Sequence, residues 1–185
     1  MKLVAHYVFS GGVLFAVGYP LLTLLLGEVG GGGVGGLAAG VAAWLAVASN
    51  ALIDRVGHVV RWSYTRGAPY PARAWRTHSV YTAPIWGVIP AAVVAAGAGD
   101  PSYLGAAAGA PVPGVWGFAG WAVGLGVIAS YTHLLLDSFT EAGVFAGRGR
   151  RVALAHLPYN SWWANLAATL GGLGLIFLTV SLAHF

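Results

Sequence analysis

Histidine and aspartate residues recur at the ends of apolar stretches in this sequence. His133 and Asp137 are four positions apart, and so are the successive members of the series Asn50, Asp54 and His58. A spacing of four places side chains along one face of a helix, so two helices are each expected to present an imidazole and a carboxylate in one direction. These groups, without thiolate, are typical ligands of zinc, manganese or iron.

Further polar residues extend this set. His6 lies one turn into the first apolar stretch, His78 opens the third, and Thr140 follows Asp137 by three positions. The candidate metal ligands are His6, Asp54, His58, His78, His133 and Asp137. Six ligands exceed the need of one ion, so one or two divalent ions are expected, with zinc first and manganese or iron as alternatives.

The same residues offer catalytic groups beyond metal binding. Asp54 or Asp137 could act as a general base instead of a ligand. Arg76, or Arg73 in its place, is close to His78 in sequence and could hold a phosphate group through its guanidinium. The pattern therefore predicts hydrolysis by an activated water, with an arginine that stabilises charge on the phosphoryl oxygens.

Several other chemistries are excluded by absent residues and motifs. The chain has no cysteine, which removes disulfides, thiolate metal sites, iron–sulfur clusters and cysteine nucleophiles. It also lacks GxxxxGK[ST], HExxH and GxSxG patterns. An ATP-driven pump, a zincin-type protease and an elbow-type serine hydrolase would each miss their main parts.

Apolar stretches must position these groups. Charged residues make up 8% of the chain and hydrophobic residues 58%, whereas an average soluble domain carries about 25% charged residues. This composition excludes a soluble enzyme, a disordered tail and a nucleic-acid-coating protein. The predicted spans are Leu3–Leu26, Val34–Ile53, Val80–Ala98, Val115–Leu136 and Trp163–Ala183. We therefore expect an all-α integral membrane protein, one polytopic domain over residues 1–185 with about five transmembrane helices.

Glycine and proline predict where these spans turn and touch. Gly30–Gly33 and the stretch Asp100–Pro113 are expected to be short turns outside the membrane. Glycines four positions apart, Gly36 with Gly40 and Gly120 with Gly124, are expected to let helices approach closely.

The basic residues predict the orientation of the chain. All nine lie before the first span, between the second and third spans, or between the fourth and fifth. The positive-inside rule places these segments, including the N-terminus, in the cytoplasm, and the protein in the cell membrane as a multi-pass chain. The first span could instead be a secretory signal, but no A-x-A-like cleavage site follows it, so we expect it to be retained.

This orientation brings the candidate ligands to one membrane level. Any one of them alone is more simply explained by a hydrogen bond between helices or by contact with interfacial water. The whole set at the cytoplasmic ends of several spans favours a functional site. His184, at the opposite end, and His156, in a loop, are not expected to take part, whereas Asn160 and Asn165 could complete the rim of the site.

Four patches of the sequence resemble a known family. They are Val-Ala-His6-Tyr, Asn50-Ala-Leu-Ile-Asp54, Arg76-Thr-His78-Ser79 and His133-Leu-Leu-Leu-Asp137-Ser-Phe-Thr140-Glu-Ala-Gly143. In this order they are similar to the YdjM-like family of membrane-bound metal-dependent hydrolases, in an archaeal branch. That family is thought to be related to zinc-dependent phospholipase C and single-strand nucleases. The resemblance implies His6, Asp54, His78, His133 and Asp137 as ligands, with His58 as a substitute for a lost one.

The resulting functional hypothesis is a metal-dependent phosphoesterase at the cytoplasmic membrane surface. Its expected partners are membrane lipids and a phosphoester such as a lipid head group, and no specific nucleic acid. Two alternatives remain: an ion or metal transporter that uses the same His and Asp groups, or a scaffold with a structural metal. A metal-free lipid phosphatase would need an arginine where Val127 stands.

Overall fold

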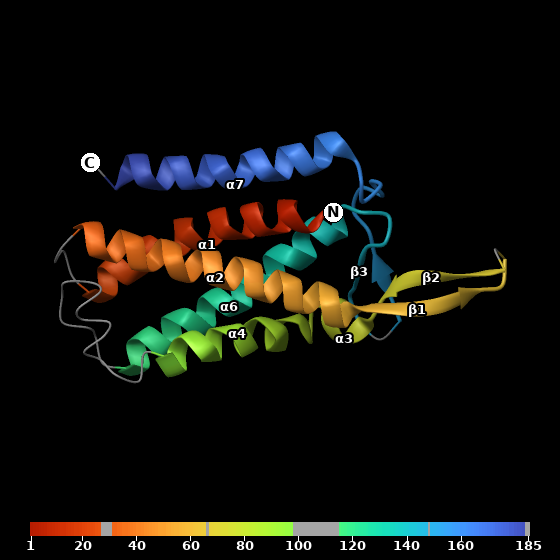
Figure 1. The fold of residues 1–185 in the computed structure, drawn as a ribbon, viewed down its shortest axis with the longest axis horizontal. Helices are drawn as coiled ribbons and strands as arrows, with labels where there is room; N and C mark the ends of the chain where they lie inside the picture. The colour runs from red at the N-terminus through yellow and green to blue at the C-terminus, as the bar shows by residue number, and fades with distance from the viewer. Residues whose placement is uncertain (27–30, 66, 98–114, 148, 184–185) are drawn as a thin grey trace.

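The computed structural model of the chain describes residues 1–26, 31–65, 67–97, 115–147 and 149–183, and most of them are helical. The helices are α1 (Leu3–Leu26), α2 (Gly31–Gly57), α3 (Trp75–His78), α4 (Ala83–Gly97), α6 (Val115–Ser138) and α7 (Trp162–Leu182). Four of them, α1, α2, α6 and α7, are long and apolar enough to cross a membrane. Figure 1 shows the long helices side by side along the longest axis of the molecule.

The third predicted span is shorter than expected. α4 has 15 residues, about 22 Å at 1.5 Å per residue, whereas the hydrocarbon core of a bilayer is about 30 Å thick. The helix does not begin at Val80, because Val80–Thr82 form a turn and the backbone N–H of Val80 donates to the Phe145 carbonyl. The backbone N–H of Ala83 then donates to the Ser79 carbonyl across a turn. Among the described residues, four helices rather than five are therefore long enough to span.

Two short antiparallel pairs of strands interrupt the helices, so the expectation of an all-α chain was incomplete. β1 (His58–Ser63) pairs with β2 (Ala68–Arg73), and β3 (Val144–Phe145) pairs with β4 (Arg151–Val152). The first pair forms a hairpin that projects beyond the end of α2 (Figure 1). Its register places His58 opposite Arg73, so the hairpin fixes these two residues beside each other.

The composition of this hairpin explains why it is not helical. β1 contains adjacent β-branched residues and a tryptophan, which favour strands. β2 carries Pro69 and Pro71, which are unfavourable in a helix interior and are tolerated in an edge strand. An arginine-rich connection between two spans therefore forms an ordered ribbon.

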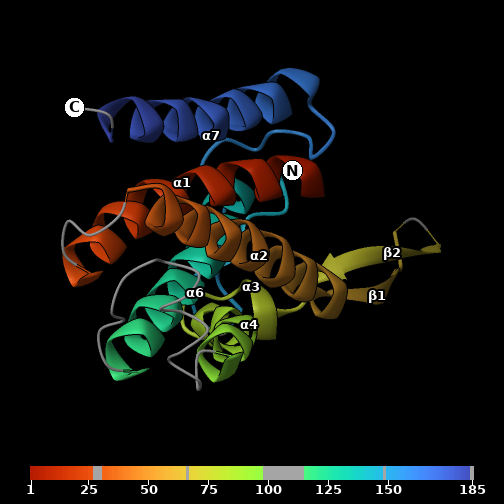
Figure 2. The ribbon, with the colours of Figure 1, turned by 60° about the vertical axis from the view of Figure 1, so that its left-hand side comes forward.

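Close packing between helices occurs at other glycines than those predicted. A Cβ atom at Gly12 would collide with Gly172 of α7, and a Cβ atom at Gly87 would collide with Gly126 of α6. No described atom lies within 4 Å of a Cβ position at Gly36, Gly40, Gly120 or Gly124. The spacing rule was wrong because it does not tell which helix face meets a neighbour. Figure 2 shows the arrangement that these glycine contacts produce, in which α7 packs on α1 and lies far from α4.

Part of the glycine run between the first two helices is helical, and Gly30 lies outside the described residues. α2 begins at Gly31, so Gly31–Gly33 are helical rather than outside the helix. Each glycine costs about 1 kcal/mol relative to alanine in a helix, but Val34 and Ala38, which follow, are buried in the main apolar core. This core also contains Leu14 and Leu125, so it joins α1, α2 and α6. The predicted turn at Asp100–Pro113 lies outside the described residues.

Candidate metal centre

Three short segments of helix bring four buried polar residues to one end of the bundle. His6 lies in the first turn of α1, His78 is the last residue of α3, and His133 and Asp137 lie in the last two turns of α6. Each is at most 1% exposed. We refer to these four residues as the His/Asp cluster.

One oxygen of Asp137 faces two imidazole nitrogens. Its Oδ2 lies 3.4 Å from Nε2 of His78 and 3.2 Å from Nε2 of His133. None of these three buried atoms, nor Nδ1 of His6, has a hydrogen-bond partner among the described residues. Buried polar atoms without partners are unfavourable. Because the atoms converge and are of the kinds that ligate divalent metals, the cluster could hold a metal ion.

Two groups of three residues have ligand atoms close enough to share an ion. One is His6, His133 and Asp137, which are all buried. The other is Asp54, His78 and His133, in which Asp54 is half-buried. In each group the ligand atoms lie within 4.8 Å of one another. His133 belongs to both groups and would therefore be the central ligand of a bound ion.

The other oxygen of Asp137 is fully occupied. Its Oδ1 lies 2.7 Å from Nη2 of Arg73, 3.2 Å from Nε2 of His6 and 3.3 Å from the amino group of Met1. Arg73 is itself buried, and its Nη1 donates to the Thr140 hydroxyl and to the Gly143 carbonyl. Asp137 is thus held in place through Oδ1, while Oδ2 stays directed at the two histidines.

The imidazole rings of the cluster pack against each other. The His6 and His133 rings are stacked with centroids 4.3 Å apart, and the His78 ring meets His133 edge-on at 5.4 Å. Burial lowers the pKa of the His78 imidazole, an effect larger than the opposing one of Asp137. His78 is therefore neutral near pH 7, which is the form that binds metals.

His58 lies beside the cluster, with its ring centroid 5.9 Å from that of His78, but it belongs to neither ligand group. The i, i+4 argument required α2 to continue through His58, but the helix ends at Gly57 and His58 begins β1. A side chain at Gly57 would collide with His78 and Thr77, so the end of α2 packs directly on α3 and the chain turns away. His58 is exposed, but its Nδ1 still lies 2.7 Å from the Asp54 carbonyl oxygen and 3.6 Å from the Asp54 carboxylate, so the predicted pairing of these two residues is present. It lies at the rim rather than among the ligands.

The two arginines that were predicted to handle phosphate are in different surroundings. Arg76 is exposed on α3, and its guanidinium makes no contact with the cluster among the residues described. Arg73 is 8% exposed and contacts Asp137 directly. The structure therefore places Arg73, the second choice of the sequence argument, at the site.

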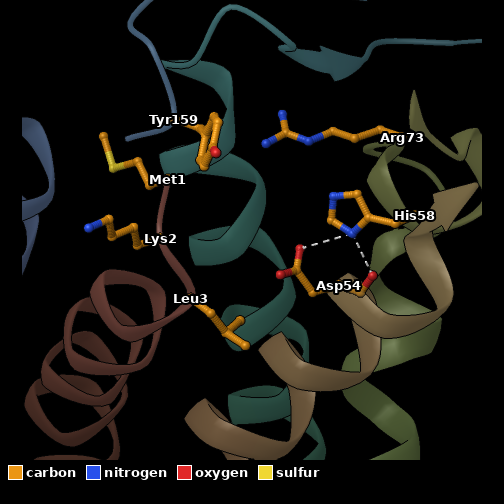
Figure 3. A pocket seen from close by; sticks show the side chains of 7 residues that line it. All are labelled: Met1, Lys2, Leu3, Asp54, His58, Arg73 and Tyr159. Carbon is orange, nitrogen blue, oxygen red and sulfur yellow. Dashed lines mark hydrogen bonds and ion pairs between the residues drawn. The ribbon is translucent and has the colours of Figure 1, made fainter. Parts of the chain in front are cut away.

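A pocket of about 320 Å³ opens beside the cluster. It is lined by Met1, Lys2, Leu3, Asp54, His58, Arg73 and Tyr159. Figure 3 shows Asp54, His58 and Arg73 on one side of it, and Met1 and Lys2 on the other. Arg73 and Met1 contact Asp137, and Asp54 belongs to a ligand group, so the pocket leads to the cluster.

Met1 and Tyr159 line the pocket but were not predicted from the sequence, because neither belongs to a motif and only the fold brings them to the site. Of the predicted rim residues, Asn165 is buried and its Oδ1 accepts a hydrogen bond from the backbone N–H of Lys2, whereas Asn160 is exposed. His156 is an exposed loop residue, as predicted. His184 lies outside the described residues.

The fold and the site together have the architecture of a helical membrane protein with a buried His/Asp cluster at one end of its helices. The chain belongs to the family described as "Protein of unknown function (DUF1286)", whose model matches residues 1–136. The matched stretch includes His6, His78 and His133 and stops one residue before Asp137. No curated protein and no solved structure matches the chain.

Proposed function

We propose that this chain is a membrane-embedded, metal-dependent hydrolase that cleaves a phosphoester at the cytoplasmic membrane surface. The observation that carries the proposal is the set of buried imidazole and carboxylate atoms without partners, next to a pocket that an arginine lines. The resemblance of the four sequence patches to YdjM-like hydrolases supports the same reading.

His6, His78, His133 and Asp137 would hold the ion, with Asp54 at the pocket side. This donor set of imidazole and carboxylate suits zinc, and manganese or iron less well. The bound ion would supply a Lewis acid for the phosphoryl oxygens and an activated water. Asp54 has a half-buried carboxylate that also lines the pocket, so it is placed to take a proton there.

The pocket supports a small phosphate-bearing group as the substrate. Its volume of about 320 Å³ is at the lower end of ligand pockets and suits a head group rather than acyl chains. Arg73 forms an ion pair with Asp137 through Nη2 and donates hydrogen bonds through Nη1, and its Nε has no hydrogen-bond partner among the described residues. That N–H can donate to a phosphate oxygen. Lys2 adds a further positive charge to the wall.

The interior below the cluster favours a hydrolase over a transporter. A transport path would need polar groups that continue toward the opposite end of the helices. Below the cluster lie Ser10, Asn50 and Thr132, which hydrogen-bond to one another. The buried serines Ser49 and Ser130 follow, and beyond them the described interior is apolar, with Leu14, Leu45 and Leu125 at most 1% exposed.

The hydrolase proposal predicts cleavage of lipid phosphoesters by zinc-loaded protein in lipid nanodiscs. Each lipid should be compared with a water-soluble short-chain ester that carries the same head group, and released phosphate or head group should be measured. We expect the lipid to react at least about tenfold faster, because the bilayer concentrates it beside the pocket. Zinc-loaded protein that cleaves nothing in the panel, but carries zinc across liposomes in a His133-dependent manner, would support the transporter instead.

A second prediction concerns topology, for which we propose five crossings, with α4 as the short one. α4 starts at the cluster end and α6 returns to it, so successive helices alternate in direction (Figure 1). All nine basic residues then lie on the cytoplasmic side. Reporters fused after Phe185 and within Gly147–Arg151 should report opposite compartments. The same compartment for both would mean that α7 does not cross and would overturn this arrangement.

A further inference from the structure

Asn50 is a fully buried amide that contacts the central ligand of the cluster. Its Oδ1 lies 2.8 Å from Nδ1 of His133, and its Nδ2 lies 2.6 Å from the Ala46 carbonyl oxygen. A carbonyl oxygen can only accept a hydrogen bond, so the amide nitrogen must face Ala46. The amide oxygen must then face His133.

This orientation determines which nitrogen of His133 carries the proton. Because Oδ1 of Asn50 is an acceptor, Nδ1 of His133 must be the donor. In the neutral ring, Nε2 then has a free lone pair, and it is the atom that lies 3.2 Å from Oδ2 of Asp137. Two acceptors that face each other at this distance repel unless a cation lies between them.

We propose that Asn50 is a positioning residue that fixes the tautomer of His133, and that the cluster consequently binds one metal ion rather than two. Nδ1 of His133 is occupied by Asn50, so this ring offers one ligand atom. Both three-residue ligand groups found among the described residues contain His133. Two ions cannot share the single free nitrogen of His133, so the two groups serve one ion. This inference rests on the metal site of the proposed function.

Asn50 is in turn held by two other helices. Its Nδ2 also lies 3.1 Å from the Ser10 hydroxyl of α1, and that hydroxyl lies 2.7 Å from the Thr132 hydroxyl of α6. All three side chains are buried. The orientation of the metal ligand is therefore coupled to the packing of α1, α2 and α6 around it.

The test measures binding of cobalt(II) alone, through its visible absorption, to purified protein. We expect one cobalt per chain, and Asn50→Leu should weaken binding about 10- to 100-fold, as is typical when the partner of a ligating histidine is lost. Asn50→Asp keeps an acceptor for Nδ1 of His133 and should restore most of the affinity. Ser49→Ala is the matched control, since Ser49 is equally buried on the same helix and its hydroxyl has no partner among the described residues.

The possible failures can be told apart. If wild-type protein binds no cobalt, the metal site of the proposed function is wrong and this inference fails with it. If wild-type protein and Asn50→Leu bind cobalt equally well, only the positioning role of Asn50 is wrong. If wild-type protein binds two cobalt ions per chain, the single metal site is wrong. If Asn50→Leu does not fold, ¹⁵N NMR of histidine-labelled, metal-free wild-type protein can determine which nitrogen of His133 is protonated. The signals that His133→Ala removes must report a protonated Nδ1, and a protonated Nε2 would overturn the inference.

Discussion

Asp137→Asn is expected to remove bound metal and to lower kcat/KM for a phosphoester by about three orders of magnitude. The substitution keeps the shape of the side chain but removes the charge that the His/Asp cluster offers to a cation. Loss of several kcal/mol of charge stabilisation corresponds to an effect of this size. Metal content by elemental analysis and initial rates should be measured on the same preparation.

Glu141→Gln provides the matched control for this experiment. Glu141 is the next acidic residue along the chain, and it is exposed outside the cluster. The same chemical change there should leave metal content and rate unchanged. Asp54→Asn tests whether Asp54 is a general base or a metal ligand. If Asp54 is the base, the variant should bind metal but hydrolyse slowly. If Asp54 is a ligand, the variant should lose both metal and activity. Full metal content and activity in Asp137→Asn would contradict the proposed site.

Chelation is expected to abolish hydrolysis without unfolding the chain. The helices are held by apolar packing around residues such as Leu14 and Leu125 and by the glycine contacts between α1 and α7 and between α4 and α6. None of these contacts involves the cluster, so helical content by circular dichroism should change little. Added zinc should then restore the rate.

The outcome of chelation distinguishes a catalytic ion from a structural one. If chelation lowers the thermal midpoint strongly and melts the helices, the ion is structural, and the scaffold alternative gains support. If the rate survives complete removal of metal, the hydrolysis does not use the ion, and the proposed mechanism is wrong. Dialysis without chelator is the control for detergent effects.

Hydropathy alone was sufficient to predict the long helices. α1 begins and ends at the predicted residues, and the predicted bounds of α6 and α7 differ by at most two residues from those observed. Hydropathy placed the start of the third span at Val80, whereas Val80–Thr82 form a turn and α4 begins at Ala83, because hydropathy counts side chains and not dihedral angles. The β1–β2 hairpin was missed for a related reason: its exposed Val60 and Trp62 lie within an arginine-rich segment that was interpreted as a loop.

For the site, a spacing of four residues predicted which side chains lie together, but not which of them join a ligand group. His133 and Asp137 share one face because α6 continues through both. His58 follows the last residue of α2, and its Nδ1 still lies 3.6 Å from the Asp54 carboxylate, but the chain turns into β1 there and His58 stays outside both ligand groups. The contact between Arg73 and Asp137 depends on the register of the hairpin, which no periodicity in the sequence encodes.

The bond between Ser10 and Thr132 joins hydroxyls that are 122 positions apart. At a synthesis rate of about 5–20 residues per second, α6 follows this part of α1 by roughly 6 to 24 s. In that interval Ser10 can bond to a carbonyl of its own helix, whereas His6 must wait for its partner Asp137. The His/Asp cluster is therefore assembled late in biosynthesis. A chain stalled before Thr132 would expose the polar side chains of α1 without their partners to the membrane-insertion machinery.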